Sequence, residues 1–69
     1  MERIPVDSSD VAAIGYDDES QTLEVEFIKS GVYQYFGVPR EVFEAFLAAD
    51  SKGRFLAQNV KGQFEYSQM

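Results

Sequence analysis

The 69-residue chain lacks cysteine and histidine altogether. Without cysteine there is no disulfide, and without either residue there is no thiolate or imidazole to bind a metal ion. The same two absences remove the cysteine nucleophile and the usual general base of enzymes. Small secreted domains usually rely on disulfides, so the composition predicts a reducing compartment, namely the cytoplasm.

Long apolar stretches are missing as well. No run approaches the ~18 residues of a membrane span, and the amino terminus has no signal-peptide core. Hydrophobic residues nonetheless make up 45% of the chain, and its six Phe and four Tyr side chains supply most of the burial area of a small core. We therefore expect one soluble, monomeric domain with no cofactor, no metal ion and no membrane partner.

Basic residues are also scarce, and the excess of acids is confined to one half of the chain. The net charge is −6, and residues 1–29 account for all of it, because acids and bases balance in residues 30–69. Nucleic-acid binding normally needs a basic face, since affinity comes largely from neutralised phosphates. Only the second half of this chain can present such a face, and that face is expected to be small.

Apolar and polar residues alternate with period two over residues 22–27, which is typical of a half-buried strand. A polar break of hairpin length precedes this segment, and a turn that contains Gly31 follows it. Residues 1–9 contain Pro5 and several turn-forming residues, so we interpret them as a lead-in without a regular element. Residues 10–36 are predicted to form a three-stranded antiparallel β-meander, with strands at residues 11–16, 22–27 and 32–36.

The two turns predict which residues pair across the strands. If the glycine of the second turn is left-handed, Val25 lies opposite Tyr35. If the first turn centres on residues 18–19, Ile14 lies opposite Leu23. The two hairpins, placed independently, agree on one apolar face and one mixed face, which supports the meander. The apolar face comprises Ala12, Ile14, Tyr16, Leu23, Val25, Phe27, Tyr33 and Tyr35, and the mixed face includes Glu24, Glu26, Ile28, Val32 and Phe36.

Two helical patterns follow the meander. Pro39 is predicted at the first helical position, where its missing N–H costs nothing. Ser51 or Asp50 can cap a second, shorter helix, which ends between Asn59 and Gly62. The apolar stripes are Val42, Phe43, Phe46 and Leu47 in the first helix, and Phe55, Leu56 and Val60 in the second.

The expected fold class is therefore α+β. A three-stranded antiparallel meander is followed by two short helices, within residues 39–62, that cover its apolar face. Residues 63–69 are expected to form an extended segment against the sheet. The side chains expected to be largely buried are Val25, Phe27, Tyr33, Phe46 and Phe55.

Five short motifs stand in order within a resemblance that extends over residues 4–66: Ile14-Gly15-Tyr16, Tyr33-Gln34-Tyr35, Gly37-Val38-Pro39, Ser51 with Gly53, and Phe64-Glu65-Tyr66. Together they resemble the KTSC domain, a family named for its occurrence at the carboxyl end of some lysyl-tRNA synthetases. The resemblance implies a short bacterial protein of unknown role, with RNA binding suggested from the synthetase association. Here Glu65 and Ser67 stand within and after the last aromatic pair, so no basic tail follows, which weakens that implication.

Acidic residues are the first candidates for chemistry. Glu24 and Glu26 share one face of a strand and can act as an acid–base pair or bind a hard cation. The alternation that pairs them also explains them as the solvated side of a half-buried strand, which we favour. Residues 17–19 lack the spacing of a calcium loop and are better explained as a hairpin turn. No Ser, Lys or Tyr has a recognisable base partner, so we do not expect an enzyme.

Tyr33 and Tyr35 point the same way from one strand, and two roles are open to them. Sheets that bind single-stranded RNA stack bases on exposed aromatic rings. In the predicted register both rings fall on the apolar face, which favours core packing with the hydroxyls at the rim. The opposite face carries Val32, Phe36 and Ile28, and it suits a protein partner.

Basic residues in the second half indicate where an anion would bind. The segment Ser51-Lys52-Gly53-Arg54 lies at a predicted helix start, whose unpaired N–H groups favour a phosphate or a carboxylate. An ordinary capped helix with two solvated basic residues is the alternative. The predicted nucleic-acid or anion-binding residues are Arg40, Ser51, Lys52, Gly53, Arg54 and Lys61. Two functions therefore remain open: an RNA-binding module, or a protein-interaction domain that uses the exposed sheet face and has no nucleic-acid role.

Overall fold

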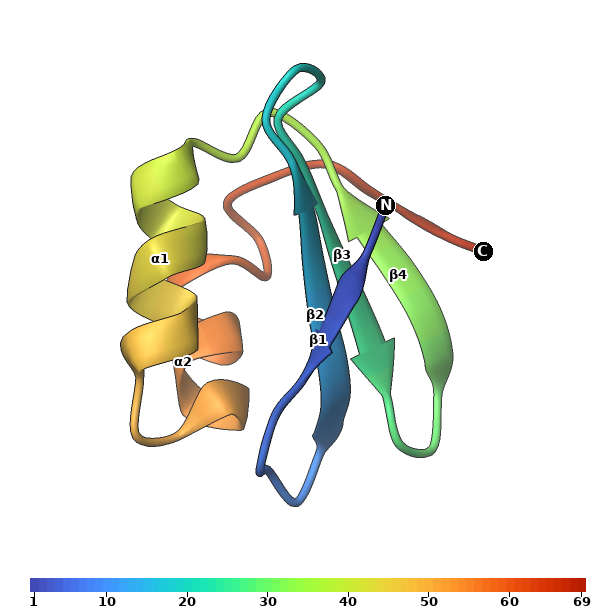
Figure 1. Cartoon of the computed structure of the whole chain (residues 1–69), viewed down its shortest axis with the longest axis vertical. Coiled ribbons are helices and arrows are strands. Elements are labelled where there is room, and N and C mark those ends of the chain that lie inside the picture. Colours follow the sequence, from blue (N-terminus) through green and yellow to red (C-terminus); the bar gives the residue numbers. More distant parts are fainter.

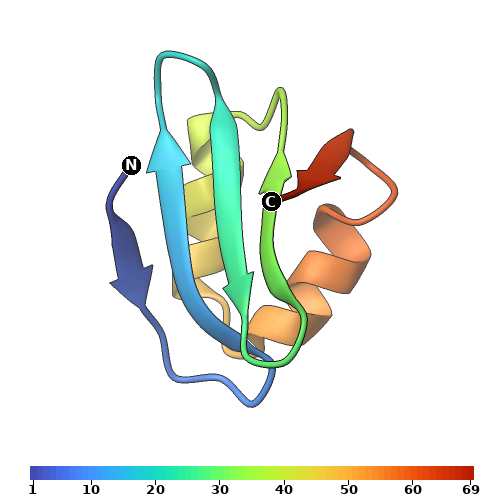
Figure 2. The same ribbon diagram turned by 90° about the vertical axis from the view of Figure 1, so that its right-hand side faces the viewer.

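The structure, a computed structural model that describes residues 1–69, consists of one antiparallel sheet with two helices against one of its faces (Figure 1). Figure 2 shows the strands side by side in the order β1-β2-β3-β4-β5, with α1 behind them. Neither helix has the length and the apolar run that crossing a membrane requires. The elements are β1 (Arg3–Pro5), β2 (Val11–Asp17), β3 (Thr22–Phe27), β4 (Gly31–Tyr35), α1 (Arg40–Ala48), α2 (Lys52–Asn59) and β5 (Tyr66–Gln68).

The α+β class is confirmed, but the predicted three-stranded sheet is wrong, because two edge strands are added to the meander. β1 pairs with β2, so the predicted lead-in contains a strand, and β5 pairs with β4 as the extended segment predicted at the end of the chain. Each edge strand has three residues, all exposed, and is too short to show the alternation that predicts a strand. Pro5 is tolerated in β1 because an edge strand has a side without ladder partners.

Both hairpins pair two residues away from the predicted register. Val25 pairs with Tyr33 instead of Tyr35, and Ile14 pairs with Val25 instead of Leu23. An offset of two leaves the side chains on their predicted faces, because the side-chain period of a strand is two. The division into an apolar and a mixed face therefore survives the error in register.

A bulge near the start of β2 changes one residue of the apolar face. Val11 lies opposite Phe27, and the register shifts between Val11 and Ala13. Val11 is therefore fully buried in the core, whereas Ala12, predicted on the apolar face, is only half-buried. The left-handed glycine predicted in the second turn is confirmed, since Gly31 has a φ of 88°.

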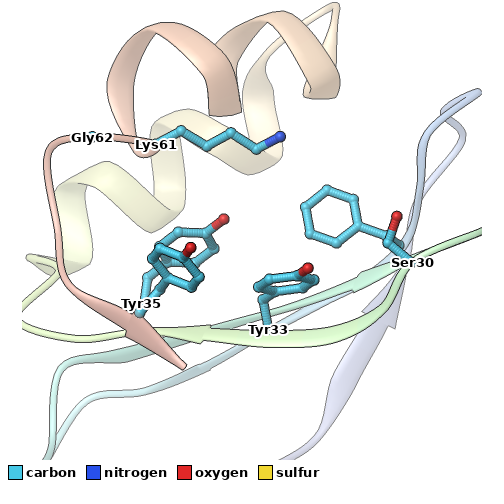
Figure 3. Close-up of a pocket in the computed structure, with 7 residues that line it drawn as sticks. Ser30, Tyr33, Tyr35, Lys61 and Gly62 are labelled. Carbon is cyan, nitrogen blue, oxygen red and sulfur yellow. The ribbon is translucent and has the colours of Figure 1, made fainter. Parts of the chain in front are cut away.

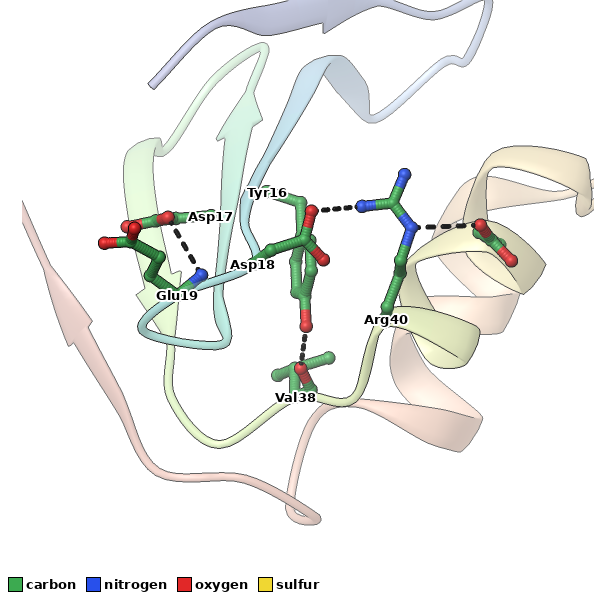
Figure 4. Close-up of polar contacts among 7 residues, drawn as sticks. Tyr16, Asp17, Asp18, Glu19, Val38 and Arg40 are labelled. Carbon is green, nitrogen blue, oxygen red and sulfur yellow. Dashed lines mark hydrogen bonds and ion pairs between the residues drawn. The ribbon is translucent and has the colours of Figure 1, made fainter.

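Two aromatic stacks hold the helical layer in place, one between the two helices and one between the sheet and α1. Phe46 of α1 is fully buried and stacks on Phe55 of α2, with ring centroids 5.3 Å apart. Tyr16 of β2 stacks on Phe43 at 4.9 Å, and its hydroxyl donates to the Val38 carbonyl (Figure 4). Burial raises the pKa of Tyr16, so this donor stays protonated at neutral pH. The core consists of Val11, Ile14, Leu23, Val25, Tyr35, Val38, Phe43, Phe46, Leu56 and Val60.

Three of the side chains predicted to be largely buried are only half-buried. Val25 and Phe46 are confirmed as fully buried, but the prediction is wrong for Phe27, Tyr33 and Phe55. Phe27 and Tyr33 stand on the helix side of the sheet at a point that neither helix covers, and they line an open pocket there. Partial exposure of this part of the apolar face is what creates the candidate site.

The helices begin within one residue of the predicted positions. Pro39 is the N-cap residue of α1, not its first helical residue, and it has extended backbone angles. Ser51 is the N-cap of α2, and its hydroxyl accepts the backbone N–H of Arg54 at 3.3 Å. This bond pairs one of the N–H groups that a helix start leaves without a partner.

Phe46→Ala is expected to lower the free energy of unfolding by about 3–5 kcal/mol, because it leaves a cavity at the centre of the helix–sheet contact. Urea denaturation followed by circular dichroism measures this loss. Leu47→Ala, a half-buried position on the same helix, is the matched control and should cost clearly less. An unshifted midpoint for Phe46→Ala would contradict the docking of α1 described here.

Gly31→Val is expected to destabilise the chain by about 1–2 kcal/mol, because a residue with a side chain is strained in the left-handed region. A Cβ at this position has room, since its nearest neighbour is 3.8 Å away, so the clash of a Cβ does not contribute to the measured loss. Ser30→Ala, one residue earlier, should change stability by less than about 0.5 kcal/mol. Equal melting temperatures for Gly31→Val and the wild type would show that this turn relaxes at no cost.

Candidate functional site

An open pocket of about 360 Å³ lies between β4, β5 and the segment that follows α2 (Figure 3). Most of its wall is aromatic, and one basic side chain reaches over it. The lining side chains are those of Phe27, Ser30, Tyr33, Tyr35, Lys61 and Tyr66. They come from parts of the chain that only the folded sheet and the turn after α2 bring together.

Three neighbouring strands supply the aromatic rings. Tyr33 and Tyr35 are two residues apart in β4, so both side chains point to the helix side. The β4–β5 pairing places Tyr66 opposite Tyr35, with its ring centroid 5.8 Å from those of both β4 tyrosines. Phe27 of β3 meets Tyr33 edge to face, with centroids 5.4 Å apart and an interplanar angle of 89°. Tyr66 is 63% exposed, so its ring is accessible at the mouth of the pocket.

Lys61 brings a positive charge to this pocket. Its backbone N–H donates to the Leu56 carbonyl at 2.8 Å, and Gly62 follows with a φ of 80°, so the chain turns sharply at the end of α2. The Lys61 Nζ lies 5.4 Å from the centroid of the Phe27 ring, within cation–π range. Lys61 forms no salt bridge, so its charge remains available to a ligand.

Hydroxyl groups add polar contacts to the aromatic wall. Burial raises the pKa of Tyr35, and the neighbouring Tyr33 and Tyr66 raise it further, so its hydroxyl is protonated and can donate at neutral pH. Figure 3 shows the Tyr33 and Tyr35 hydroxyls on the side of the sheet that Lys61 faces. Ring faces, hydroxyls and one cation suit a flat, unsaturated group that carries negative charge nearby.

The paired tyrosines of β4 differ in burial, so core packing is confirmed for Tyr35, and base stacking by Tyr33 stays a prediction. Tyr35 is 3% exposed and belongs to the core, whereas Tyr33 is half-buried and forms part of the pocket wall. Sequence reasoning did not assign Phe27 and Tyr66 to this site. The closing aromatic pair of residues 64–66 was the available signal, but its position depends on a strand pairing between distant parts of the chain.

The other basic residues predicted to bind an anion lie away from the pocket. Arg40, the first residue of α1, forms ion pairs with Asp18 of the first hairpin and with Glu44 (Figure 4). Lys52 lies beyond the opposite end of α1 and donates to a backbone carbonyl there. Only Lys61 lies at the aromatic pocket. The predicted cations therefore do not form one continuous basic patch.

A carboxylate of the chain itself lies against the start of α2. A Cβ added to Gly53 would lie 2.8 Å from the Asp10 Oδ2, so this carboxylate lies directly against the helix start. Two further aspartates border the same hollow, beside Arg54. Binding of an outside anion by residues 51–54 stays a prediction, but such an anion has to compete with the Asp10 carboxylate.

The opposite face of the sheet carries a buried polar cluster. Glu24 is 6% exposed, accepts a hydrogen bond from the Gln34 Nε2 at 3.0 Å and pairs with the Arg3 Nε at 3.1 Å. Arg3 passes over Gly15, where a Cβ would lie 3.1 Å from the Arg3 Cγ. The prediction that Glu24 is solvated is therefore wrong, because β1, absent from the predicted fold, brings Arg3 over it.

The three apolar residues predicted to share that face, Val32, Phe36 and Ile28, do not all lie on it. Val32 is half-buried, and Phe36 is 40% exposed. Ile28 is 53% exposed but lies in the turn after β3, where it borders a hollow with Gly53 and Leu56 of α2. Ile28 is thus turned toward the helix side, so the predicted surface for a protein partner is smaller than expected.

Comparison with known proteins identifies relatives along nearly the whole chain. An uncharacterised protein from Stutzerimonas stutzeri is 48% identical over 63 residues, which cover 91% of this chain and 89% of that protein. A lysine–tRNA ligase from Nostoc sp. is 40% identical over 63 residues, which cover 91% of this chain but 11% of the ligase.

A solved structure has the same fold. The crystal structure of a KTSC domain protein from Yersinia pestis superposes with a TM-score of 0.97 and 43% sequence identity, covering 99% of this chain and 96% of that one. The family model described as the KTSC domain matches residues 7–64, which span β2 to α2 and include both β4 tyrosines of the pocket. On these grounds the chain belongs to the KTSC domain family.

Proposed function

We propose that this chain is a small, non-catalytic binding module for RNA, with one unpaired base held in the aromatic pocket. The observation that carries the proposal is the grouping of Tyr33, Tyr35 and Tyr66 around one pocket beside the unpaired ammonium of Lys61. Proteins that bind unpaired RNA stack its bases on aromatic rings and place cations near its phosphates. A volume of about 360 Å³ is within the range of sites for small organic groups.

A relative of the chain supports RNA as the ligand. A segment similar to this chain makes up 11% of the lysine–tRNA ligase from Nostoc sp., an enzyme whose name gives tRNA as its substrate. A module that shares a chain with such an enzyme works close to RNA. This association and the aromatic pocket favour the same class of ligand for independent reasons.

A protein ligand is the second candidate, and the charge of the chain favours it. The net charge is −6, and both Arg3 and Arg40 are paired with carboxylates of the chain itself. Much of the surface therefore repels a phosphate backbone. A protein partner would use the exposed sheet face around Val32 and Phe36 and would need no nucleic acid. Because the two candidates use opposite faces of the sheet, single substitutions separate them.

Tyr66→Ala is expected to weaken the binding of a short oligoadenylate about 5- to 150-fold, the equivalent of one stacked base. The exposure of the Tyr66 ring means that the fold should survive the change. Lys61→Glu should weaken binding as well, most strongly at low salt, because it reverses the charge at the pocket. Fluorescence anisotropy with labelled RNA measures both effects, and circular dichroism checks the fold.

Tyr66→Phe keeps the ring and should retain binding, and Phe36→Ala removes an exposed ring outside the pocket and should have no effect. Undiminished affinity in both Tyr66→Ala and Lys61→Glu would contradict the proposed site. If only Arg54→Glu lost affinity, the start of α2 would be favoured as the RNA-binding site. If the wild type binds no RNA even at low ionic strength, the protein-interaction role becomes the better account.

A further inference from the structure

On the basis of the proposed function, we infer that the aromatic pocket engages no more than two consecutive nucleotides. The substrate class is then RNA that presents one unpaired base in a loop, a bulge or an end, and a longer single strand makes no further contact with the chain. The distribution of charge around the pocket sets this limit, because it determines how far a phosphate backbone can follow the surface.

Two cations stand on one side of the pocket. Lys61 borders both the pocket and a second hollow, which continues past Phe27 and Ser30 and is also bordered by Lys29. Neither lysine takes part in a salt bridge. A backbone that leaves the pocket in this direction therefore meets two unpaired ammonium groups, which can neutralise two phosphates.

Acidic groups border the path on both sides. The second hollow is also bordered by Asp10, whose carboxylate lies against the start of α2. Beyond Tyr66, on the other side of the pocket, a shallow hollow is bordered by Glu65 and by no basic residue. A carboxylate next to a phosphate opposes its binding, because like charges repel strongly at a partly dehydrated surface.

The remaining cations do not extend the path. Arg3 is on the opposite face of the sheet, where it pairs with two glutamates. Arg40 pairs with two acids between the first hairpin and α1. Lys52 and Arg54 border a hollow with three aspartates. A third phosphate of a bound strand therefore finds no unpaired cation within the continuous hollow.

Adenylate probes of increasing length test this footprint with the whole wild-type chain. Labelled AMP and oligoadenylates of two, four and eight nucleotides are titrated at several salt concentrations. We expect the affinity to rise from one to two nucleotides. Beyond that it should rise only with the number of positions at which two nucleotides can be placed, about threefold for four nucleotides and about sevenfold for eight.

The salt dependence gives a second, independent measure of the same footprint. Each neutralised phosphate of a single strand contributes about −0.7 to the slope of log K against log salt concentration, so the slope should be no steeper than about −1.4 for every probe. Lys29→Ala should bring it to about −0.7, because one phosphate contact is lost. Arg54→Ala, which removes a charge of the same sign outside the hollow, is the matched control and should leave the slope unchanged.

Structured probes test the substrate class directly. A blunt-ended RNA duplex with a single bulged adenosine should bind at least as tightly as the two-nucleotide probe, and the same duplex without the bulge should not bind. Two results would overturn the short footprint while the proposed RNA binding stands. One is an affinity for the longer probes that exceeds the expected threefold and sevenfold gains, and the other is a salt slope clearly steeper than about −1.4. Absence of binding to every probe would overturn the proposed function, and the footprint with it.

Discussion

The pairing of β3 with β4 places Tyr33 opposite Val25 and Tyr35 opposite Leu23, all on the face that the helices cover. Burial of this face holds the sheet and helices together, since Leu23 and Val25 are fully buried. The two helices are too short to cover the face completely, because α2 ends at Asn59 and the chain then turns. One register thus produces both the core and the aromatic pocket, which lies where the core is left uncovered.

The chain pairs its two arginines Arg3 and Arg40 with its own acids and leaves its other basic residues without a salt bridge. Arg3 holds the amino-terminal strand to the sheet through Glu24, and Arg40 ties α1 to the first hairpin. These pairs use two of the six basic residues for internal contacts. Lys61 is different because it follows the end of α2 and forms no salt bridge, although Asp10 borders the same hollow. Net acidity and local attraction of an anion are therefore compatible in one small domain.

The sequence was sufficient to predict the two faces of the sheet, the two helices and the cap of the second helix by Ser51, because all of these depend on local periodicity and on a single capping residue. The register of the first hairpin could not be predicted to the residue, since its turn is closed by Gln21 at a φ of 53°, a conformation for which this residue type gives no signal. β1 and β5 are three residues each and show no alternation. For that reason neither the burial of Glu24 under Arg3 nor the position of Tyr66 in the pocket could be predicted from the sequence. The contact of Asp10 with the start of α2 likewise joins segments that are distant in sequence.

The most direct test of base binding in the aromatic pocket is an NMR titration of the isotope-labelled chain with a two-nucleotide oligoadenylate at low salt. If a base binds in this pocket, the ring resonances of Tyr33 and Tyr66 and the amide of Lys61 shift together and saturate with one dissociation constant. Amides of the α2 start, such as that of Arg54, should stay in place. Shifts confined to the α2 start, or to Phe36 and Val32 on the opposite face of the sheet, would contradict base binding in this pocket.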